Sequence, residues 1–175
     1  TGFWQFLTVP AKQFGLEVNT EVDERYNVER STEAACKYLT EAYKELGSWT
    51  LAAASYNMGI EGVKRQLEKQ KVATYFDLLL NEETSRYVFR LTALKEVFSN
   101  PAKNGFKIRK KDMYPPIPVN TIQIEGGITD LVDFAKEHQI NFKILKLFNP
   151  WLRQYSLTNK EKRVYLIKIP DPAFN

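Results

Sequence analysis

The chain has 175 residues, of which 43% are hydrophobic, and it carries a formal net charge of +4. This length suits one medium domain or two small ones, and the apolar content predicts a packed core. One cysteine and one histidine are present, which excludes a disulfide within the chain and a zinc site built from His and Cys ligands. No apolar run is long enough to span a membrane, and the charge lacks the density of a nucleic-acid-binding face.

The first 27 residues predict short helical pieces followed by an irregular segment. Gln5 lies between Trp4 and Phe6. An amide among apolar neighbours needs a hydrogen-bond partner, which the backbone or a bound ligand can supply. Residues 16–27 alternate acidic residues with valines and predict a surface loop.

Residues 28–100 have the pattern of an all-helical domain with short connections. The expected helix starts follow the good N-cap residues Asn27 or Ser31, Ser48 and Asn81. Trp49 is expected to anchor the core, and Cys36, next to two alanines, to be a small buried residue. An Asn-Pro pair at residues 100–101 ends the last helix.

Within this region, residues 51–62 (LAAASYNMGIEG) stand out. The small residues allow another helix to approach closely, and alanine favours helix. Gly59 suits a left-handed cap, which places Tyr56 and Asn57 at the helix end. Two interpretations remain open: a core tyrosine beside a capping asparagine, or two polar groups that point together into a cleft.

Residues 103–119 differ in composition from what precedes them. A basic run (KIRKK, residues 107–111) is followed by three prolines within residues 115–118. Prolines at this density predict an extended chain, so this stretch is interpreted as a linker along the first domain. A membrane-surface or nucleic-acid patch is the alternative.

The remaining residues predict a strand, two short helices and a second strand. The first strand is expected at residues 121–124 and the second at residues 163–169. The helices are centred on Leu131 and on Leu145, with Asn141 as the cap of the second. His138 is expected at the surface.

Three stretches resemble motifs of one enzyme family. Residues 2–6 (GFWQF) resemble its Gly-Leu-Met/Trp-Gln-Phe/Ile motif, residues 54–59 (ASYNMG) its Ala-Tyr-Asn-Ala-Gly signature, and residues 83–88 (ETSRYV) its Glu-Thr-Arg-x-Tyr-Val motif. The family is that of the lytic murein transglycosylases, in the soluble-lytic-transglycosylase and goose-type-lysozyme superfamily, with the membrane-bound type D group most similar. This resemblance implies an α-helical, lysozyme-like core.

The C-terminal part resembles a LysM module, a small peptidoglycan-binding fold, although it departs from that pattern at residues 138–139 and 151–162. The predicted fold class is therefore α+β: a lysozyme-like domain over residues 1–102, a linker over 103–119 and a βααβ LysM-like module over 120–175. Whether the module binds glycan or packs on the helical domain is left open, with packing favoured. Trp151 is either the sugar-binding residue or a core residue.

The resemblance implies peptidoglycan glycan strands as substrate, cleaved between N-acetylmuramic acid and N-acetylglucosamine to leave 1,6-anhydro ends. Tyr56 would act at the catalytic centre, while Gln5, Asn57, Glu83 and Tyr87 would bind or orient the substrate. Tyr87 can equally be a core tyrosine, and Glu83 is expected to orient rather than to act as the acid. No metal or cofactor is expected.

The family's general-acid glutamate lies upstream of the Gly-x-x-Gln motif and is therefore expected to precede this chain, so this fragment alone is expected to be inactive. The resemblance also implies a periplasmic or outer-membrane-associated protein, with any membrane anchor outside the fragment and a monomeric state. Nucleic acid is not an expected partner. The alternatives are a non-catalytic glycan-binding protein on the same scaffold, or a helical interaction module unrelated to cell walls.

Overall fold

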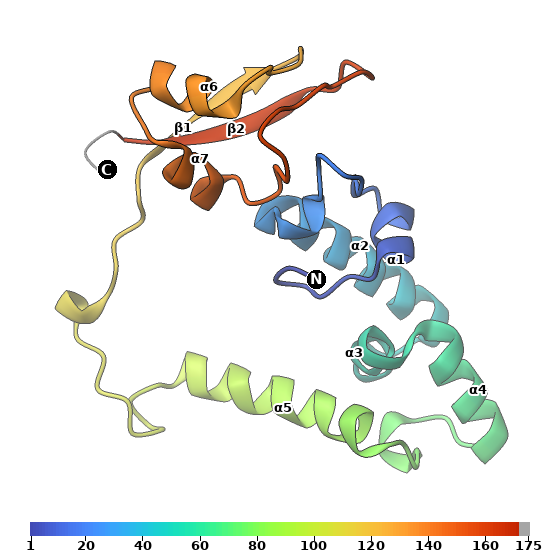
Figure 1. The fold of residues 1–175 in the computed structure, drawn as a ribbon. Coiled ribbons are helices and arrows are strands. Elements are labelled where there is room, and N and C mark those ends of the chain that lie inside the picture. Colours follow the sequence, from blue (N-terminus) through green and yellow to red (C-terminus); the bar gives the residue numbers. More distant parts are fainter. Residues whose placement is uncertain (172–175) are drawn as a thin grey trace. The chain divides into compact units, whose positions relative to one another are not determined.

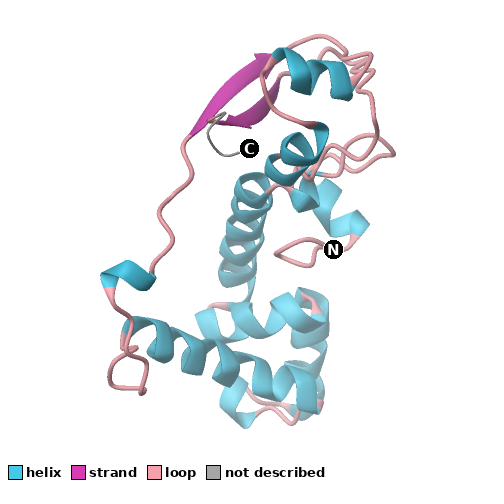
Figure 2. Cartoon of the chain, turned by 60° about the vertical axis from the view of Figure 1, so that its left-hand side comes forward, coloured by secondary structure: helices cyan, strands magenta, loops and turns pink. Residues whose placement is uncertain are grey.

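A computed structural model describes residues 1–171 and confirms the α+β class, with helices over about half of the described residues and one small antiparallel sheet (Figures 1 and 2). The structure divides into two compact units. One contains Thr1–Ala35 and the segment from Pro115 onward, and the other is Cys36–Tyr114. Helix α2 (Val28–Leu46) runs from the first unit into the second.

The second unit is entirely helical within its described secondary structure. After the end of α2 it contains α3 (Trp49–Met58), α4 (Ile60–Gln70), the 3-10 turn η2 (Tyr75–Asp77), α5 (Glu82–Ser99) and the 3-10 turn η3 (Lys110–Asp112). Helix α3 contacts α4, α5 and η2. Its alanines make this close approach possible, because small side chains keep the helix surfaces near each other. The buried core of the unit consists of Leu51, Ala54, Val63, Tyr75 and Val88.

Local capping chemistry explains where these helices begin. The Asn81 side chain accepts a hydrogen bond from the Thr84 backbone amide at 2.9 Å, which confirms the predicted start of α5. Asn27 likewise accepts from the Arg30 amide at 3.1 Å at the start of α2. Ser48 stands at the N-cap position of α3 but makes no side-chain cap bond.

The first unit holds the predicted strand–helix–helix–strand order. Strand β1 (Val119–Ile124) pairs antiparallel with β2 (Tyr165–Pro170), and α6 (Leu131–Glu137) and α7 (Phe142–Phe148) lie between them in the chain. The N-terminal part of the unit adds α1 (Thr8–Gln13), the 3-10 turn η1 (Glu24–Tyr26) and the start of α2. The apolar residues of α6, α7 and β2 form one core with Trp151, Leu152 and Leu157.

Residues 102–118 are exposed throughout. This agrees with an extended, proline-rich stretch that buries little of its own surface. The predicted domain boundaries at residues 102 and 120 stay a prediction.

Two predicted core residues are instead exposed. Trp49 is 58% exposed and stacks on Tyr43, with ring centroids 4.4 Å apart, because it is the first residue of α3 and precedes the buried face that begins at Leu51. Cys36 is exposed because it follows Ala34 and Ala35, which already occupy the inward face of α2. Successive residues of a helix are rotated by about 100° around its axis, so a side chain one position away from a buried residue can face the solvent.

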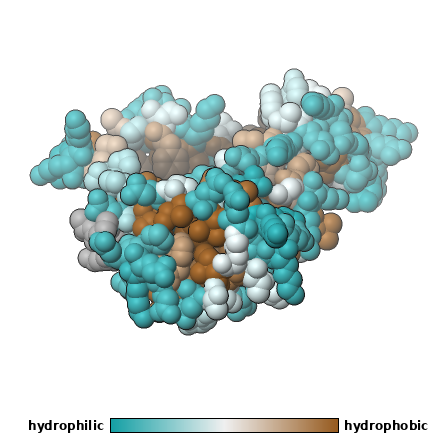
Figure 3. Space-filling model, turned by 90° about the horizontal axis from the view of Figure 1, so that it is seen from above, coloured by the Kyte–Doolittle hydropathy of each residue, from teal (hydrophilic) through white to brown (hydrophobic). Residues whose placement is uncertain are grey.

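Apolar side chains also remain at the surface elsewhere. The C-terminal half of α5 leaves Leu94 and Phe98 exposed, the latter by 79%. On the face of the molecule seen in Figure 3, apolar residues are gathered within a hydrophilic surround. Among residues 1–171, no helix combines the length and the apolar character that crossing a membrane requires.

Candidate functional site

The end of α3 carries the first two candidate site residues. The Ser55 carbonyl accepts the Gly59 amide at 2.7 Å, and Gly59 has a φ of 82°, a conformation that favours glycine and ends the helix. Tyr56 and Asn57 therefore lie in the last turn, and both are partly buried. The local sequence thus explains the position of these two residues: the alanines favour helix up to the polar pair, and the glycine ends the helix just after it.

Asn57 joins α3 to the first turn of α5. Its side-chain nitrogen donates to the Glu83 carboxylate at 3.2 Å, and its side-chain oxygen accepts the Thr84 hydroxyl at 2.7 Å. Thr84 is fully buried. These two bonds fix which way the amide points, since the donor can face only the carboxylate and the acceptor only the hydroxyl. The second and third motifs therefore meet through Asn57.

Tyr56 lies near two other tyrosines, Tyr38 and Tyr87. The ring of Tyr38 meets its ring edge-on, with centroids 5.3 Å apart and an interplanar angle of 89°. Burial raises the pKa of Tyr56 well above its usual value, and the neighbouring phenols of Tyr87 and Tyr38 raise it further. Burial also raises the pKa of Tyr87. Tyr56 is a neutral phenol at physiological pH, as a tyrosine with its ordinary pKa also is, and its hydroxyl is a hydrogen-bond donor as well as an acceptor.

Sequence reasoning missed three residues that support this cluster. Tyr38 donates to the Ser55 carbonyl at 2.7 Å, which fastens α2 to α3 one residue before Tyr56. The buried Tyr75 donates to the Ser85 carbonyl at 2.7 Å and holds the first turn of α5. Thr84, described above, is the third. Only Thr84 lies inside a recognisable motif, so only its position offered a sequence signal.

Gln5 belongs to the other compact unit, which contains Thr1–Ala35 and the segment from Pro115 onward. It is exposed, has a φ of 55°, and donates from its side chain to the Gly2 carbonyl at 2.5 Å. A non-glycine residue at positive φ is strained, and such strain often accompanies functional sites. The four remaining candidates, Tyr56, Asn57, Glu83 and Tyr87, come together in the helical unit.

Gly2 has a steric reason to be glycine. A Cβ atom at this position would lie 1.9 Å from the Arg25 carbonyl oxygen, and the residue has a φ of 70°. No other residue type fits there without moving the backbone. The first residue of the GFWQF motif is therefore explained by the close approach of residue 25.

Trp151 is a core residue of the LysM-like module. It is 4% exposed and stacks on Tyr165, with ring centroids 5.6 Å apart. Nearby Asn149 is fully buried and exchanges two hydrogen bonds with the backbone of Lys168, at 2.7 and 2.8 Å. A buried ring cannot present its face to a sugar, so of the two interpretations of Trp151 the structure favours packing.

The first unit also contains an open groove of about 610 Å³ beside β2. Four glutamates line it, and each is paired with an arginine or a lysine that also lines the groove: Glu17 with Arg163, Glu24 and Glu33 with Arg30, and Glu29 with Lys168. The lining thus offers four carboxylates and three cationic side chains, so most of its negative charge is compensated. Across residues 1–171, no three His, Cys, Asp or Glu side chains cluster in a way that could hold a metal ion.

Comparison with known proteins confirms the resemblance. Residues 1–78 match the transglycosylase SLT domain, and residues 120–173 match the C-terminal LysM-like domain of soluble lytic transglycosylase. Two relatives, both named membrane-bound lytic murein transglycosylase D, come from Escherichia coli (strain K12) and Escherichia coli O6:H1. Each is 28% identical over 116 residues, which cover 63% of this chain and 26% of the relative. The chain thus spans about a quarter of their length.

Proposed function

We propose that the protein containing this chain is a peptidoglycan lytic transglycosylase that cleaves the bond between N-acetylmuramic acid and N-acetylglucosamine. The observation that carries the proposal is the convergence of two family motifs on one cluster. Asn57 bonds to both Glu83 and Thr84, and the partly buried Tyr56 lies next to it in the chain. The matches to an SLT domain and to lytic murein transglycosylases support the same reaction class.

The proposed reaction needs one acid and no water. A glutamic acid upstream of this chain, where the family places it, would protonate the glycosidic oxygen as the bond to C1 breaks. The substrate's N-acetyl carbonyl would stabilise the cationic intermediate. The C6 hydroxyl oxygen then bonds to C1 and its proton returns to the glutamate, which leaves a 1,6-anhydro end. All atoms are accounted for without a metal or cofactor.

In this scheme the residues of the chain bind and orient. Tyr56, a neutral phenol at physiological pH, would donate a hydrogen bond to the acid or to the N-acetyl oxygen. Glu83 and Thr84 hold the Asn57 amide in place, while Tyr87 would contribute to the same side of the cleft. Gln5, in its strained turn, would contact the glycan.

The same proposal gives a place of action and the role of the parts. The substrate lies in the cell envelope, so the protein would act in the periplasm or at the outer membrane. Residues 1–102 and 120–175 would form its catalytic and LysM-like domains, joined by the linker over 103–119. We further propose that the protein is a monomer and that the chain 1–175 alone is inactive, because the acid is missing from it.

The test is digestion of purified sacculi by the full-length protein, with products identified by mass spectrometry. Anhydro-muropeptides are expected from the wild type and about a hundredfold fewer from Tyr56→Phe, because a donor at the reacting centre is lost. Tyr43→Phe is the matched control, since Tyr43 is an exposed tyrosine that stacks on Trp49. The chain 1–175 alone should yield none.

Each other outcome points to a different function. Reducing ends without anhydro products would mean a hydrolase of the lysozyme type. Binding to sacculi without products from the full-length protein would instead support a non-catalytic glycan-binding protein on this scaffold. Equal activity of the Tyr56→Phe and Tyr43→Phe variants would show that the Tyr56 hydroxyl does not act at the catalytic centre.

A further inference from the structure

The segment of residues 16–27, predicted as a surface loop, is built into the LysM-like module. Val22 is 1% exposed and belongs to the core of that module. Its neighbours pair with the module through the backbone: the Asp23 amide donates to the Trp151 carbonyl at 2.9 Å, and the Arg153 amide donates to the Glu21 carbonyl at 2.7 Å. The segment thus lies against the module as a short extra strand would.

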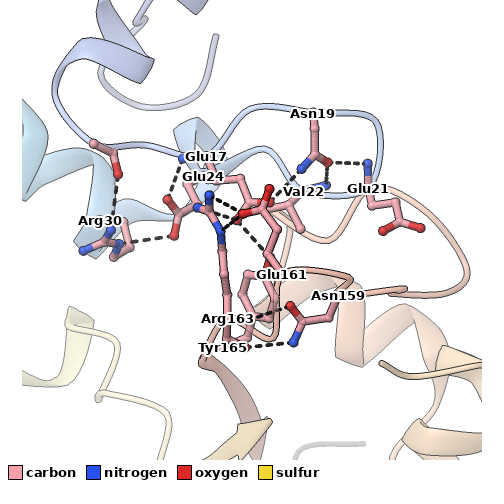
Figure 4. Close-up of polar contacts among 11 residues, drawn as sticks. Glu17, Asn19, Glu21, Val22, Glu24, Arg30, Asn159, Glu161, Arg163 and Tyr165 are labelled. Atoms are coloured by element: carbon pink, nitrogen blue, oxygen red, sulfur yellow. Dashed lines mark hydrogen bonds and ion pairs between the residues drawn. The ribbon is translucent and has the colours of Figure 1, made fainter. Parts of the chain in front are cut away.

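Side chains on the N-terminal side of Val22 secure the same contact. The Glu21 carboxylate accepts from the Thr158 amide at 3.1 Å and from its hydroxyl at 2.6 Å. The Glu17 carboxylate accepts the Tyr165 hydroxyl at 2.9 Å and pairs with Arg163 at 3.3 Å (Figure 4). Hydrogen bonds to charged groups are the stronger kind, so the segment is held by more than apolar packing.

Beyond the module, the contacts continue to the GFWQF motif through Arg25. Its guanidinium forms a fork with the Asp23 carboxylate, at 2.8 and 2.7 Å. The remaining nitrogen donates to the Phe6 carbonyl at 3.4 Å and to the Thr8 hydroxyl at 3.1 Å. The ionic side chains are only 14% and 10% exposed. Burial by itself would raise the pKa of Asp23, but the bonds from Arg25 outweigh it and lower the pKa, so the pair stays charged.

The backbone of Arg25 also fixes the motif directly. A Cβ atom on residue 2 would lie only 1.9 Å from the Arg25 carbonyl oxygen. The Gly2 carbonyl in turn accepts a hydrogen bond from the Gln5 side chain at 2.5 Å. One continuous series of contacts therefore runs from the Trp151 carbonyl through Asp23 and Arg25 to Gly2 and Gln5. Every member lies in the same compact unit.

We propose that the LysM-like module positions the Gln5 turn for substrate, and that Arg25 is the positioning residue through which it acts. This proposal rests on the function proposed above, because it gives the turn a glycan to meet. The module would then be an internal support of the Gln5 turn rather than a separate glycan-binding part. Arg25 itself would touch no substrate.

The kinetic test compares Arg25→Lys with Arg30→Lys in the full-length protein. Lysine keeps the charge but cannot form the fork and reach residues 6 and 8 together. We expect KM for soluble glycan strands to rise about three- to tenfold, the equivalent of one lost hydrogen bond, with kcat within about twofold because the interaction lost is one of substrate binding. Arg30 pairs with Glu24 and Glu33 at a more exposed position, so its variant should match the wild type.

A double-mutant cycle identifies the route of the effect. If Arg25 acts through Gln5, Arg25→Lys should add little to a Gln5→Ala protein, so the two losses will not sum. Fully additive losses in kcat/KM would overturn the proposal. An unchanged KM in Arg25→Lys would do the same.

A second readout needs no activity. The Trp4 indole donates to the Thr32 hydroxyl at 2.7 Å and sits beside Gln5, so a 5-fluorotryptophan label at Trp4 reports the position of the turn by fluorine NMR. Arg25→Lys and Val22→Thr, which places a hydroxyl in the module core, should both shift or broaden this signal. Arg30→Lys should not. An unchanged fluorine signal in the first two variants would refute the positioning role, even where sacculi are cleaved normally. A shifted signal in a protein that cleaves no sacculi would contradict only the proposed function.

Discussion

The hydroxyl of Thr84 offers the sharpest test of the cluster. Thr84→Val keeps the size and shape of a fully buried side chain but removes the donor that Asn57 accepts at 2.7 Å. The lost bond costs about 1 kcal/mol, and the Asn57 oxygen left without its partner adds up to a similar amount. Asn57 is only partly buried, so water relieves some of that penalty. We therefore expect the free energy of unfolding to fall by about 1–2 kcal/mol.

The assay is urea denaturation followed by circular dichroism, with the midpoint and slope fitted together. Thr92→Val is the matched control: Thr92 lies on the same helix and its hydroxyl donates only to the Val88 carbonyl of its own helix, at 2.9 Å. Its variant should stay within about 0.5 kcal/mol of the wild type, as surface substitutions usually do. Equal losses of unfolding free energy in the two variants would show that the hydrogen bond to Asn57 contributes nothing specific to stability. This result would contradict the inference that Asn57 joins the two motifs.

Three other measurements follow from the structure. The pKa of Asp23 is lowered in the folded state from the ordinary 3.8, so its stabilisation is present at neutral pH and is lost as the pH falls below that value; Asp23→Asn should therefore lose less stability on acidification below about pH 4 than the wild type does. Exposed Cys36 should react with a thiol reagent in the native protein within the time of mixing, and slow, unfolding-limited labelling would contradict its place on α2. Trp151→Phe should lower the thermal midpoint of the module but leave sacculus binding unchanged, since the ring is buried; lost binding at unchanged stability would restore a sugar-binding role.

Much of the local structure could be predicted because it depends on near neighbours in the chain. The caps at Asn81 and Asn141 act within three residues of themselves, so composition and spacing suffice to place the starts of α5 and α7. The strand pair follows from alternation in the same way. Errors arose where one helical position decides burial, as at Trp49.

The less predictable features depend on contacts far apart in the sequence. Nothing in residues 16–27 shows that Val22 enters a core formed mainly by residues beyond 130, because two valines in a short polar stretch do not establish which of them is buried. The pairing of Asn57 with Thr84 spans 27 residues, and here only the resemblance of two motifs to one family suggested that they meet. Tyr38 had neither signal, and its role became visible only through its bond to the Ser55 carbonyl.

The glycine of the first motif also depends on contacts that are distant in the sequence. Gly2 is required by the carbonyl of Arg25, a residue held in place by its ion pair with Asp23, which is in turn bonded to the LysM-like module at Trp151. A substitution in the module can therefore disturb the first residues of the chain without touching them. It follows that the two matched segments, residues 1–78 and 120–173, are not independent in this fold. The Gln5 turn depends for its shape on residues that lie more than a hundred positions away in the sequence. The effect of a substitution in one segment therefore depends on its contacts with the other.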